Sequence, residues 1–288
     1  VTKVKTGIVF EGGAFRTIFS CGVMDALVEN DIMPDYMIGV SAGAAYGVSM
    51  ASKQPRRNLD VLMKYRNDKR YLGLSNMIDK DNKSIYGLEF SYETIPNELN
   101  LFDYDAFKQY KGDFYCVVTN LLTGQPEYMK YTGDDRTNTV LKATCALPML
   151  FPPIIINDVP YMDGGLSDSI PYLKAIEDGC DRIIVVLTRQ SGYTKTTSRS
   201  TKAIAYSYRN QYPKLTETML TRASRYNESL KGLDQYVKEG RIITIQPTTS
   251  KGFSRLEKDK NKILSMYNDG YNQCYELLDT IKEFYGIK

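Results

Sequence analysis

The chain has 288 residues, of which 42% are hydrophobic and 25% are charged, and its formal net charge is +3. These values are typical of a globular protein with one large or two small domains, and the charge is too small to favour nucleic-acid binding. No apolar run approaches the roughly 20 residues that a membrane-spanning helix needs, and residues 1–10 lack a signal-peptide pattern. We therefore predict a cytoplasmic protein, with peripheral contact at the inner membrane surface as an open alternative.

The cysteine and histidine content argues against a metal site. The chain has no histidine, and its cysteines are scattered without a C-x-x-C pair: Cys21, Cys116, Cys145, Cys180 and Cys274. A zinc site would be hard to build from this set. We expect buried, reduced thiols, no metal and no cofactor.

The first third of the chain alternates short apolar segments with helical patterns. Residues 6–15 (TGIVFEGGAF) predict a buried strand that ends in glycines, and 35–40 (DYMIGV) predict a second one. Apolar residues recur at helical spacing in three segments, 16–29, 41–52 and 58–70. Residues 71–98 are mixed in composition and predict a loop-rich region.

The middle of the chain adds a strand pair, a hairpin and another strand–helix unit. Two strands are predicted at 114–124 and 126–131, with a turn near Gly124. A helix at 138–147 stops at Pro148, a hairpin at 152–165 turns at Asn157-Asp158, and a helix at 172–177 precedes the apolar strand 182–188. Strands alternating with helices predict an α/β fold with a largely parallel sheet covered on both faces.

Beyond Thr188 the chain becomes basic and helical. Residues 191–226 contain one acid, Glu217, and seven basic residues: Lys195, Arg199, Lys202, Arg209, Lys214, Arg222 and Arg225. A long helical stripe follows through Leu215, Met219, Tyr226, Leu230, Leu233 and Val237. The end of the chain predicts a strand at 241–247 and one helix with a stripe at Ile263, Tyr267, Tyr271, Cys274, Leu278 and Ile281. We predict a single domain over 1–288, with a core at 4–190 and a helical elaboration with one strand at 191–288.

Gly39-Val40-Ser41-Ala42-Gly43 matches the Gly-x-Ser-x-Gly pattern of serine hydrolases. In that motif a strand turns sharply into a helix and exposes the serine hydroxyl, and small neighbours are needed because the backbone is crowded. An apolar strand precedes Ser41 and a helix of small residues follows it. The alternative is that Ser41 only caps the following helix, since serine is a favoured N-cap residue.

A second loop, Glu11-Gly12-Gly13-Ala14-Phe15-Arg16, also lies between a strand and a helix. Main-chain N–H groups in such a turn stabilise the oxyanion of acyl transfer, and losing one donor costs about 3 kcal/mol. A dinucleotide-binding loop would need G-x-G-x-x-G, which is absent. Because this loop lies one strand–helix unit before Ser41, both are expected at the same edge of a parallel sheet.

The missing histidine decides which residue can activate Ser41. The Ser-His-Asp arrangement is closed to this chain, and no lysine lies in a Ser-x-x-Lys arrangement around Ser41. A carboxylate remains, and burial raises its pKa into a useful range. Asp163 follows the apolar hairpin and precedes Gly164-Gly165, so we predict a Ser41–Asp163 dyad, although the same Asp-Gly-Gly segment viewed alone is typical of an ordinary turn.

Three blocks of the sequence, taken in order, resemble the bacterial patatin-like phospholipases over nearly the whole chain. They are residues 11–27 (EGGAFRTIFSCGVMDAL), 39–43 (GVSAG) and 146–189, which contain the Asp-Gly-Gly turn. The resemblance implies a three-layer α/β/α sandwich. It also implies hydrolysis of lipid acyl esters, of phospholipase A or lysophospholipase type, by a Ser–Asp dyad without histidine or metal.

Carried onto this sequence, the resemblance implies Ser41 as nucleophile, Asp163 as base and main-chain groups of Gly12, Gly13 and Ala14 as the oxyanion hole. Ala42 and Arg16 stand as supporting residues. Arg16 matches the family's basic residue after the glycines; it either fixes the loop or steers an anionic head group, or is a solvated first-turn arginine. The family block normally runs Gly-Gly-Gly-x-Arg-Gly, so Ala14 and Thr17 are departures, and a positive φ at Ala14 would strain the loop by about 1 kcal/mol.

The departures keep two alternatives to the hydrolase open. One is a weakly catalytic or non-catalytic lipid- or acyl-binding module, and the other is an acyltransferase on the same scaffold. The basic segment 191–226 predicts either contact with anionic membranes or, as the favoured alternative, a solvated helical face or subunit contact.

Overall fold

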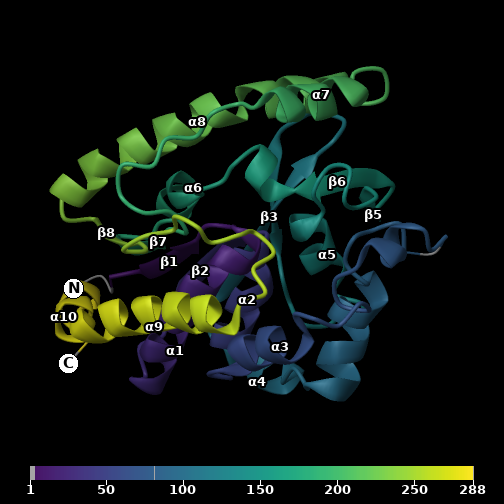
Figure 1. The fold of residues 1–288 in the computed structure, drawn as a ribbon. Coiled ribbons are helices and arrows are strands. Elements are labelled where there is room, and N and C mark those ends of the chain that lie inside the picture. Colours follow the sequence, from purple (N-terminus) through teal and green to yellow (C-terminus); the bar gives the residue numbers. More distant parts are fainter. Residues whose placement is uncertain (1–3, 81, 288) are drawn as a thin grey trace.

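The computed structural model describes residues 4–80 and 82–287, which form an eight-stranded sheet with helices on both faces (Figure 1). Five strands run parallel: β1 (Thr6–Phe10), β2 (Tyr36–Val40), β3 (Asp113–Asn120), β7 (Arg182–Val186) and β8 (Ile242–Ile245). Three are antiparallel to their neighbours: β4 (Pro126–Lys130), β5 (Ile154–Ile156) and β6 (Val159–Asp163). The order is β5-β6-β3-β2-β1-β7-β8, with β4 paired to β3. The predicted sandwich with a largely parallel sheet is confirmed.

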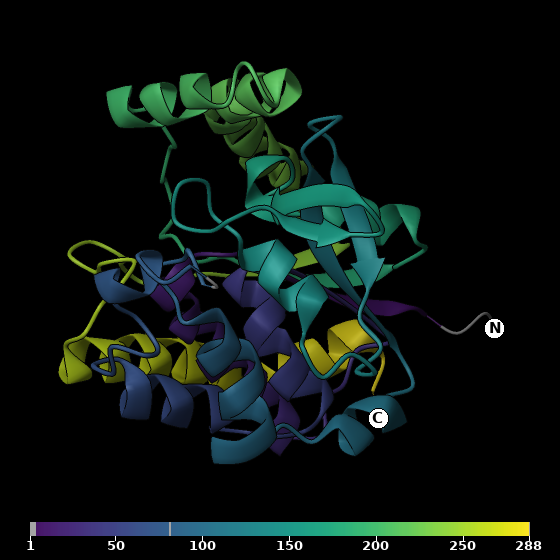
Figure 2. The ribbon, with the colours of Figure 1, turned by 90° about the vertical axis from the view of Figure 1, so that its right-hand side faces the viewer.

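Both faces of the sheet are buried, which explains the continuous apolar runs of its central strands. On β1, Ile8 and Phe10 pack with residues of α1 (Ile18–Glu29) and α9 (Lys260–Glu276). Val9, between them, packs with residues of α6 (Tyr172–Glu177) and α8 (Pro213–Lys238). Alternate side chains of one strand therefore belong to two separate cores. Figures 1 and 2 show α8 and α9 on opposite sides of the sheet.

The remaining helices complete the layers and the edge around the sheet. They are α2 (Ala42–Ala51), α3 (Arg57–Tyr65), α4 (Tyr104–Gln109), α5 (Thr139–Cys145), α7 (Arg199–Ser207) and α10 (Leu278–Tyr285). Shorter or irregular turns are η1 (Ala14–Thr17), η2 (Leu74–Met77), η3 (Phe90–Leu99) and η4 (Gly164–Leu166). In the described residues no helix combines the length and the apolarity needed to cross a bilayer.

Several predicted boundaries are wrong. The helix predicted at 58–70 ends at Tyr65, and the one predicted from Arg16 begins as the 3-10 turn η1. Residues 71–98, predicted to be loop-rich, include most of the π-helix η3, which contains Pro96. The single C-terminal helix is two helices, α9 and α10, that meet at Leu277.

Two short helices, α4 and α7, were not predicted. The α7 helix is basic and largely exposed, and its one buried residue, Ala205, lies against α8, where its carbonyl accepts a 2.8 Å hydrogen bond from the Thr216 hydroxyl. A nine-residue helix is marginal by itself. Packing on α8, rather than local propensity, therefore decides this element.

The crossing of α1 and α9 depends on two glycines that face each other's backbone. A Cβ placed on Gly22 of α1 would lie 2.1 Å from the carbonyl oxygen of Tyr267, and one on Gly270 of α9 would lie 2.0 Å from that of Phe19. Neither helix can accept a methyl group there without separating. The C-terminal part of the chain is thus held against the first helix by close backbone contact.

We predict that Gly22→Ala lowers the free energy of unfolding by about 1–3 kcal/mol because of this overpacking. Helix propensity alone predicts the opposite, a gain of about 1 kcal/mol. Ser265→Ala, at an exposed position of α9, is the control and should change stability by less than about 0.5 kcal/mol. Urea unfolding of the three proteins measures the difference, and a neutral or stabilising Gly22→Ala would contradict the prediction.

Candidate active site

The register of β3 brings Ser41 and Asp163 together. Val40, the last residue of β2, pairs with Val117 of β3, and Asp163, the last residue of β6, pairs with Val118. Because β4 occupies the opposite edge of β3, the strands β2 and β6 share one edge and meet end to end. Ser41 follows Val40 directly, so the two predicted site residues meet where the two strands end.

Ser41 occupies a sharp strand-to-helix turn with strained backbone angles. Its φ is 55° and its ψ is −129°, a conformation that is unfavourable for a residue with a side chain. The flanking glycines are required by space, since a Cβ on Gly39 would lie 2.5 Å from the backbone of Ala44 and one on Gly43 would lie 2.5 Å from the Phe10 carbonyl oxygen. The Ser41 side chain makes no capping hydrogen bond to α2, so the interpretation of Ser41 as a simple N-cap is wrong.

Thr144 of α5 braces this turn, and the sequence analysis missed it. The main-chain N–H of Ser41 donates a 2.9 Å hydrogen bond to the Thr144 hydroxyl, which in turn donates to the Val117 carbonyl oxygen at 2.5 Å. The buried threonine thus ties the strained turn to β3. No motif marks Thr144, because its partners lie 103 and 27 residues away in the chain.

The carboxyl group of Asp163 is buried, with 3% of the residue exposed. Burial raises the pKa of Asp163 above its usual range. The Ser41 hydroxyl acts in the opposite direction, followed by the charge of Arg222 and the N–H of Gly165. That N–H donates to Asp163 Oδ1 at 2.7 Å. Burial therefore outweighs these partners, and the pKa of Asp163 stays above its usual value although they lower it.

The glycine-rich loop packs directly against the Ser41 turn. A Cβ on Gly12 would lie 2.6 Å from the Val40 carbonyl oxygen and 2.8 Å from Ser41 Cβ, so only glycine fits. Among the described residues, the main-chain N–H groups of Gly12, Gly13, Ala14 and Ala42 donate to no protein acceptor. Ala42 begins α2, whose helix dipole adds positive potential at the same place.

Ala14, where the resembled family has glycine, has a φ of 49°. This left-handed conformation strains alanine but not glycine. Ala14 therefore has the positive φ that the sequence analysis named as a source of strain. Glu11 holds the loop from behind, because its carboxylate accepts 2.7 Å hydrogen bonds from the Thr188 N–H and from the Tyr226 hydroxyl.

We predict that Ala14→Gly raises the free energy of unfolding by about 1 kcal/mol, because it relieves the positive φ. The matched control is Ala203→Gly at an exposed position of α7, where the same change should lower stability by about 1 kcal/mol. Chemical denaturation of both variants gives the comparison. Equal destabilisation by the two changes would show that position 14 is not strained.

Arg16 is only 6% exposed, so the interpretation of a solvated first-turn arginine is wrong. It lines a cavity that we call the polar cavity. This cavity is lined by Glu11, Gly12, Gly13, Ala14, Arg16, Val40, Ser41, Leu147, Asp163, Gly165, Ser169, Arg189, Lys195, Arg222 and Arg255. All predicted site residues except Ala42 line it, and four cations from the second half of the chain join them.

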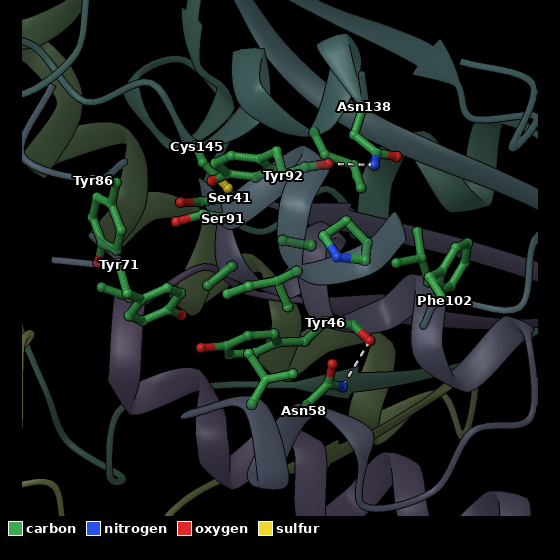
Figure 3. A pocket seen from close by; sticks show the side chains of 18 of the residues that line it. Ser41, Tyr46, Asn58, Tyr71, Tyr86, Ser91, Tyr92, Phe102, Asn138 and Cys145 are labelled. Atoms are coloured by element: carbon green, nitrogen blue, oxygen red, sulfur yellow. Dashed lines mark hydrogen bonds between the residues drawn. The ribbon is translucent and has the colours of Figure 1, made fainter. Parts of the chain in front are cut away.

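A second cavity, which we call the apolar cavity, begins at the same serine (Figure 3). Its walls are mainly aliphatic and aromatic, and include Ala42, Val48, Val61, Tyr71, Tyr86, Tyr92, Ile95, Phe102, Leu141 and Phe151. Part of the wall comes from residues 71–98, so this segment packs against the site and encloses one side of the cavity. The hydroxyl of Ser91, in the same wall, is buried and has no hydrogen-bond partner among the described residues.

The cysteines are all free, as predicted, and four of them are buried. The half-buried fifth, Cys145, lines the apolar cavity with Ser41. Burial raises the pKa of its thiol to about 12, so it stays protonated near neutral pH and is a poor nucleophile. The described residues contain no cluster of three or more cysteine or acidic side chains that could hold a metal ion.

The basic segment 191–226 divides into two groups. Lys195 and Arg222 line the polar cavity, and Arg225 donates a 2.6 Å hydrogen bond to the Leu166 carbonyl oxygen. The other four, Arg199, Lys202, Arg209 and Lys214, are exposed on α7 and its junction with α8. The prediction of membrane contact depends on these four residues.

Two parts of the chain match known protein families. The family model described as patatin-like phospholipase matches residues 8–176, more than half of the chain. The chain belongs to the patatin-like phospholipase family. The match contains both Ser41 and Asp163. A second model, described as a domain of unknown function (DUF6363), matches residues 212–286, which contain Arg222 and Arg255.

Curated relatives of this patatin-like chain are similar at modest identity. The "Uncharacterized protein YjjU" of Escherichia coli (strain K12) is 27% identical over 196 residues, which cover 64% of this chain and 52% of that protein. "Lysophospholipase nte1" of Aspergillus terreus is 29% identical over 193 residues, 63% of this chain but 12% of that protein. The solved structure of VipD from Legionella pneumophila matches with a TM-score of 0.48 and 15% identity, covering 96% of this chain and 67% of that chain.

Proposed function

We propose that this protein is a serine hydrolase of lipid acyl esters, of phospholipase A or lysophospholipase type, in which Ser41 is the nucleophile and Asp163 the base. The observation that carries the proposal is the meeting of Ser41, Asp163 and the Gly12–Ala14 loop at the ends of β2 and β6. A cavity lined mainly by aliphatic and aromatic side chains, which suit an acyl chain, begins at the same serine.

In the first step the Ser41 hydroxyl attacks the ester carbonyl carbon and its proton passes to the Asp163 carboxylate. The carbonyl oxygen becomes an oxyanion, which the free N–H groups of Gly12, Gly13, Ala14 and Ala42 are available to stabilise. When the tetrahedral intermediate collapses, Asp163 returns the proton to the leaving alcohol. The acyl chain is now bound to Ser41 as an ester.

The second step repeats the same chemistry with water. Asp163 takes a proton from a water molecule, the resulting hydroxide attacks the acyl-Ser41 carbonyl, and the proton returns to Ser41 as the fatty acid leaves. A carboxylate can serve in both steps because burial raises its pKa toward the working pH. Attack by another alcohol in place of water would make the same site an acyltransferase.

The family membership and the lysophospholipase relatives support this proposal. Those relatives match over 63% of this chain, but the match is 12% of their own length, so the substrate is proposed from the site itself. We also propose that 1–288 acts as one unit, because β8 extends the sheet and Arg222 and Arg255 line the polar cavity.

A fluorophosphonate probe tests the nucleophile. Wild type should be labelled and Ser41→Ala should not, and kcat/KM for aryl esters and lysophospholipids should fall at least about 10³-fold in both Ser41→Ala and Asp163→Asn. Ser167→Ala, a nearby hydroxyl outside both cavities, is the control and should retain labelling. Equal labelling of all variants, or no labelling and no ester turnover by wild type, would reject the hydrolase in favour of a binding module. Products formed with competing alcohols would identify an acyltransferase.

The pH profile tests the base. Since Asp163 must be deprotonated to accept a proton, activity should fall as the pH drops through its raised pKa, above the value of about 4 for an exposed aspartate. Arg222→Gln removes a positive charge that lowers this pKa, so the acidic limb of kcat/KM should move to higher pH.

The effect of Arg222 should depend on its charge. Arg222→Lys is expected to restore the acidic limb partly, whereas Lys231→Gln, at an exposed position of the same helix, should leave it in place. An acidic limb that is identical in wild type and Arg222→Gln would contradict the assignment of Asp163 as the titrating base.

A further inference from the structure

The apolar cavity becomes polar with distance from Ser41. Next to Ser41 it follows α2, where Ala42, Ala45 and Val48 line it one after another. Farther along, its lining includes several polar side chains: Arg57, Asn58, Tyr131 and Asn138. Asn138 immediately precedes α5, whose last turn lies beside Ser41, so this residue marks the far end of the cavity. The free end of an acyl chain bound here would therefore meet polar groups.

The guanidinium group of Arg57 lies at a definite distance from the proposed nucleophile. Its Nη1 donates a 3.3 Å hydrogen bond to the hydroxyl of Ser49, about two turns of α2 beyond Ser41. Because an α-helix rises about 1.5 Å per residue, Ser49 lies about 12 Å from Ser41 along the helix. The guanidinium carbon is also 5.5 Å from the ring centroid of Phe102, which lies across the cavity from Ser41 (Figure 3).

The charge of Arg57 has no carboxylate partner within residues 4–80 and 82–287. Besides the bond to Ser49, its Nε and Nη2 donate to the main-chain carbonyl oxygens of Leu101 and Asn100, at 3.3 and 2.8 Å. These neutral acceptors leave N–H donors of the guanidinium unused. Burial lowers the pKa of Arg57 to about 10, since a buried cation without a counter-ion is costly.

A structural role explains only part of this arrangement. The hydrogen bonds to Asn100 and Leu101 fix the segment after η3 to the start of α3. A neutral donor could make such bonds without the cost of a buried charge, so they do not explain why a cation lines this cavity. Arginine suits a carboxylate, because the planar N–H pairs of its guanidinium match the two carboxylate oxygens.

The distance between Ser41 and Arg57 sets the length of an acyl group that reaches both. An extended chain advances about 1.2 Å per covalent bond, so an octanedioyl group places its terminal carboxylate roughly 8 Å from the ester carbonyl. A hydrogen bond from the guanidinium adds about 3 Å. An octanedioyl group therefore spans the distance along α2, with its methylene groups against the aliphatic and aromatic walls.

We propose that Arg57 forms a carboxylate subsite at the far end of the apolar cavity, which selects acyl groups whose free end carries a carboxylate. The inference rests on the proposed hydrolase and deepens it by naming the class of acyl group. The ester carbonyl lies at Ser41, and the terminal carboxylate pairs with Arg57. An acyl chain that ends in a methyl group would leave the charge of Arg57 uncompensated.

The kinetic test compares the aryl esters of octanoic acid and octanedioic acid, which differ only at the free end of the acyl chain. Wild type should prefer the octanedioyl ester, and the ratio of the two kcat/KM values should fall about 10- to 100-fold in Arg57→Met. Arg57→Lys keeps the charge and should restore the ratio partly. The control is Arg56→Met, at the exposed neighbouring position, which should keep the wild-type ratio.

The ratio distinguishes recognition from support of the fold. If Arg57 only fixed the Asn100–Leu101 segment, Arg57→Met would lower the melting temperature and change both kcat/KM values by the same factor. An unchanged ratio in Arg57→Met would therefore overturn the subsite, whatever the effect on stability.

A binding test separates the subsite from catalysis. Calorimetry on Ser41→Ala should detect the monomethyl ester of octanedioic acid, and adding Arg57→Met should weaken its binding at least about tenfold. Octanoate that depends equally on Arg57, together with an unchanged kinetic ratio, would assign Arg57 to the carboxylate of a released fatty acid and overturn the acyl assignment. Absence of ester turnover in wild type would instead reject the hydrolase, and calorimetry alone would then decide the subsite.

Discussion

The pairing of two strands with successive residues of one edge of β3 is the constraint on which the site depends. β2 ends at the partner of Val117, and β6, running the other way, ends at the partner of Val118. Adjacent residues of a strand are separated by about 3.3 Å. The residue after β2 and the last residue of β6 therefore lie next to each other. A shift of β6 by one residue would turn Asp163 to the opposite face of the sheet. The antiparallel hairpin at the edge of a parallel sheet is therefore what creates the site.

Close backbone contact is the second feature that positions the site. Gly12 packs on Val40 and Ser41, Gly39 on Ala44, and Gly164 so near Val117 that a Cβ would lie 2.1 Å from its carbonyl oxygen. These contacts and the Thr144 hydrogen bond hold the backbone of Ser41 in its strained conformation. The neighbouring glycine-rich loop contains a second strained residue, Ala14, at which glycine would fit without strain.

The two cavities that meet at Ser41 differ in their electrostatic character. The apolar cavity is walled by aromatic and aliphatic side chains, whereas the polar cavity gathers positive charge around a buried carboxyl group. Arg222 acts on Asp163 by charge and on its turn by a hydrogen bond. Its charge lowers the pKa of Asp163, and its Nε donates to the Gly165 carbonyl oxygen. The segment beyond β7 thus covers one face of the sheet and also supplies basic side chains to the polar cavity.

The sequence by itself determined the central sheet, the order of its strand–helix units and the family. Apolar runs, the Gly39–Gly43 motif and the Asp163-Gly164-Gly165 turn are local patterns, and the absence of histidine narrowed the chemistry to a carboxylate without any structural information. Ser41 and Asp163 as a dyad remain a prediction that the geometry supports. What the sequence did not reveal depends on tertiary contact. Thr144 and Arg255 carry no motif, α7 is stabilised by packing on α8, and the helix at Phe90–Leu99 contains a proline that local rules treat as a stop. Only the folded chain sets which distant residues share a cavity, because strand register and helix packing, not sequence neighbours, bring their side chains together.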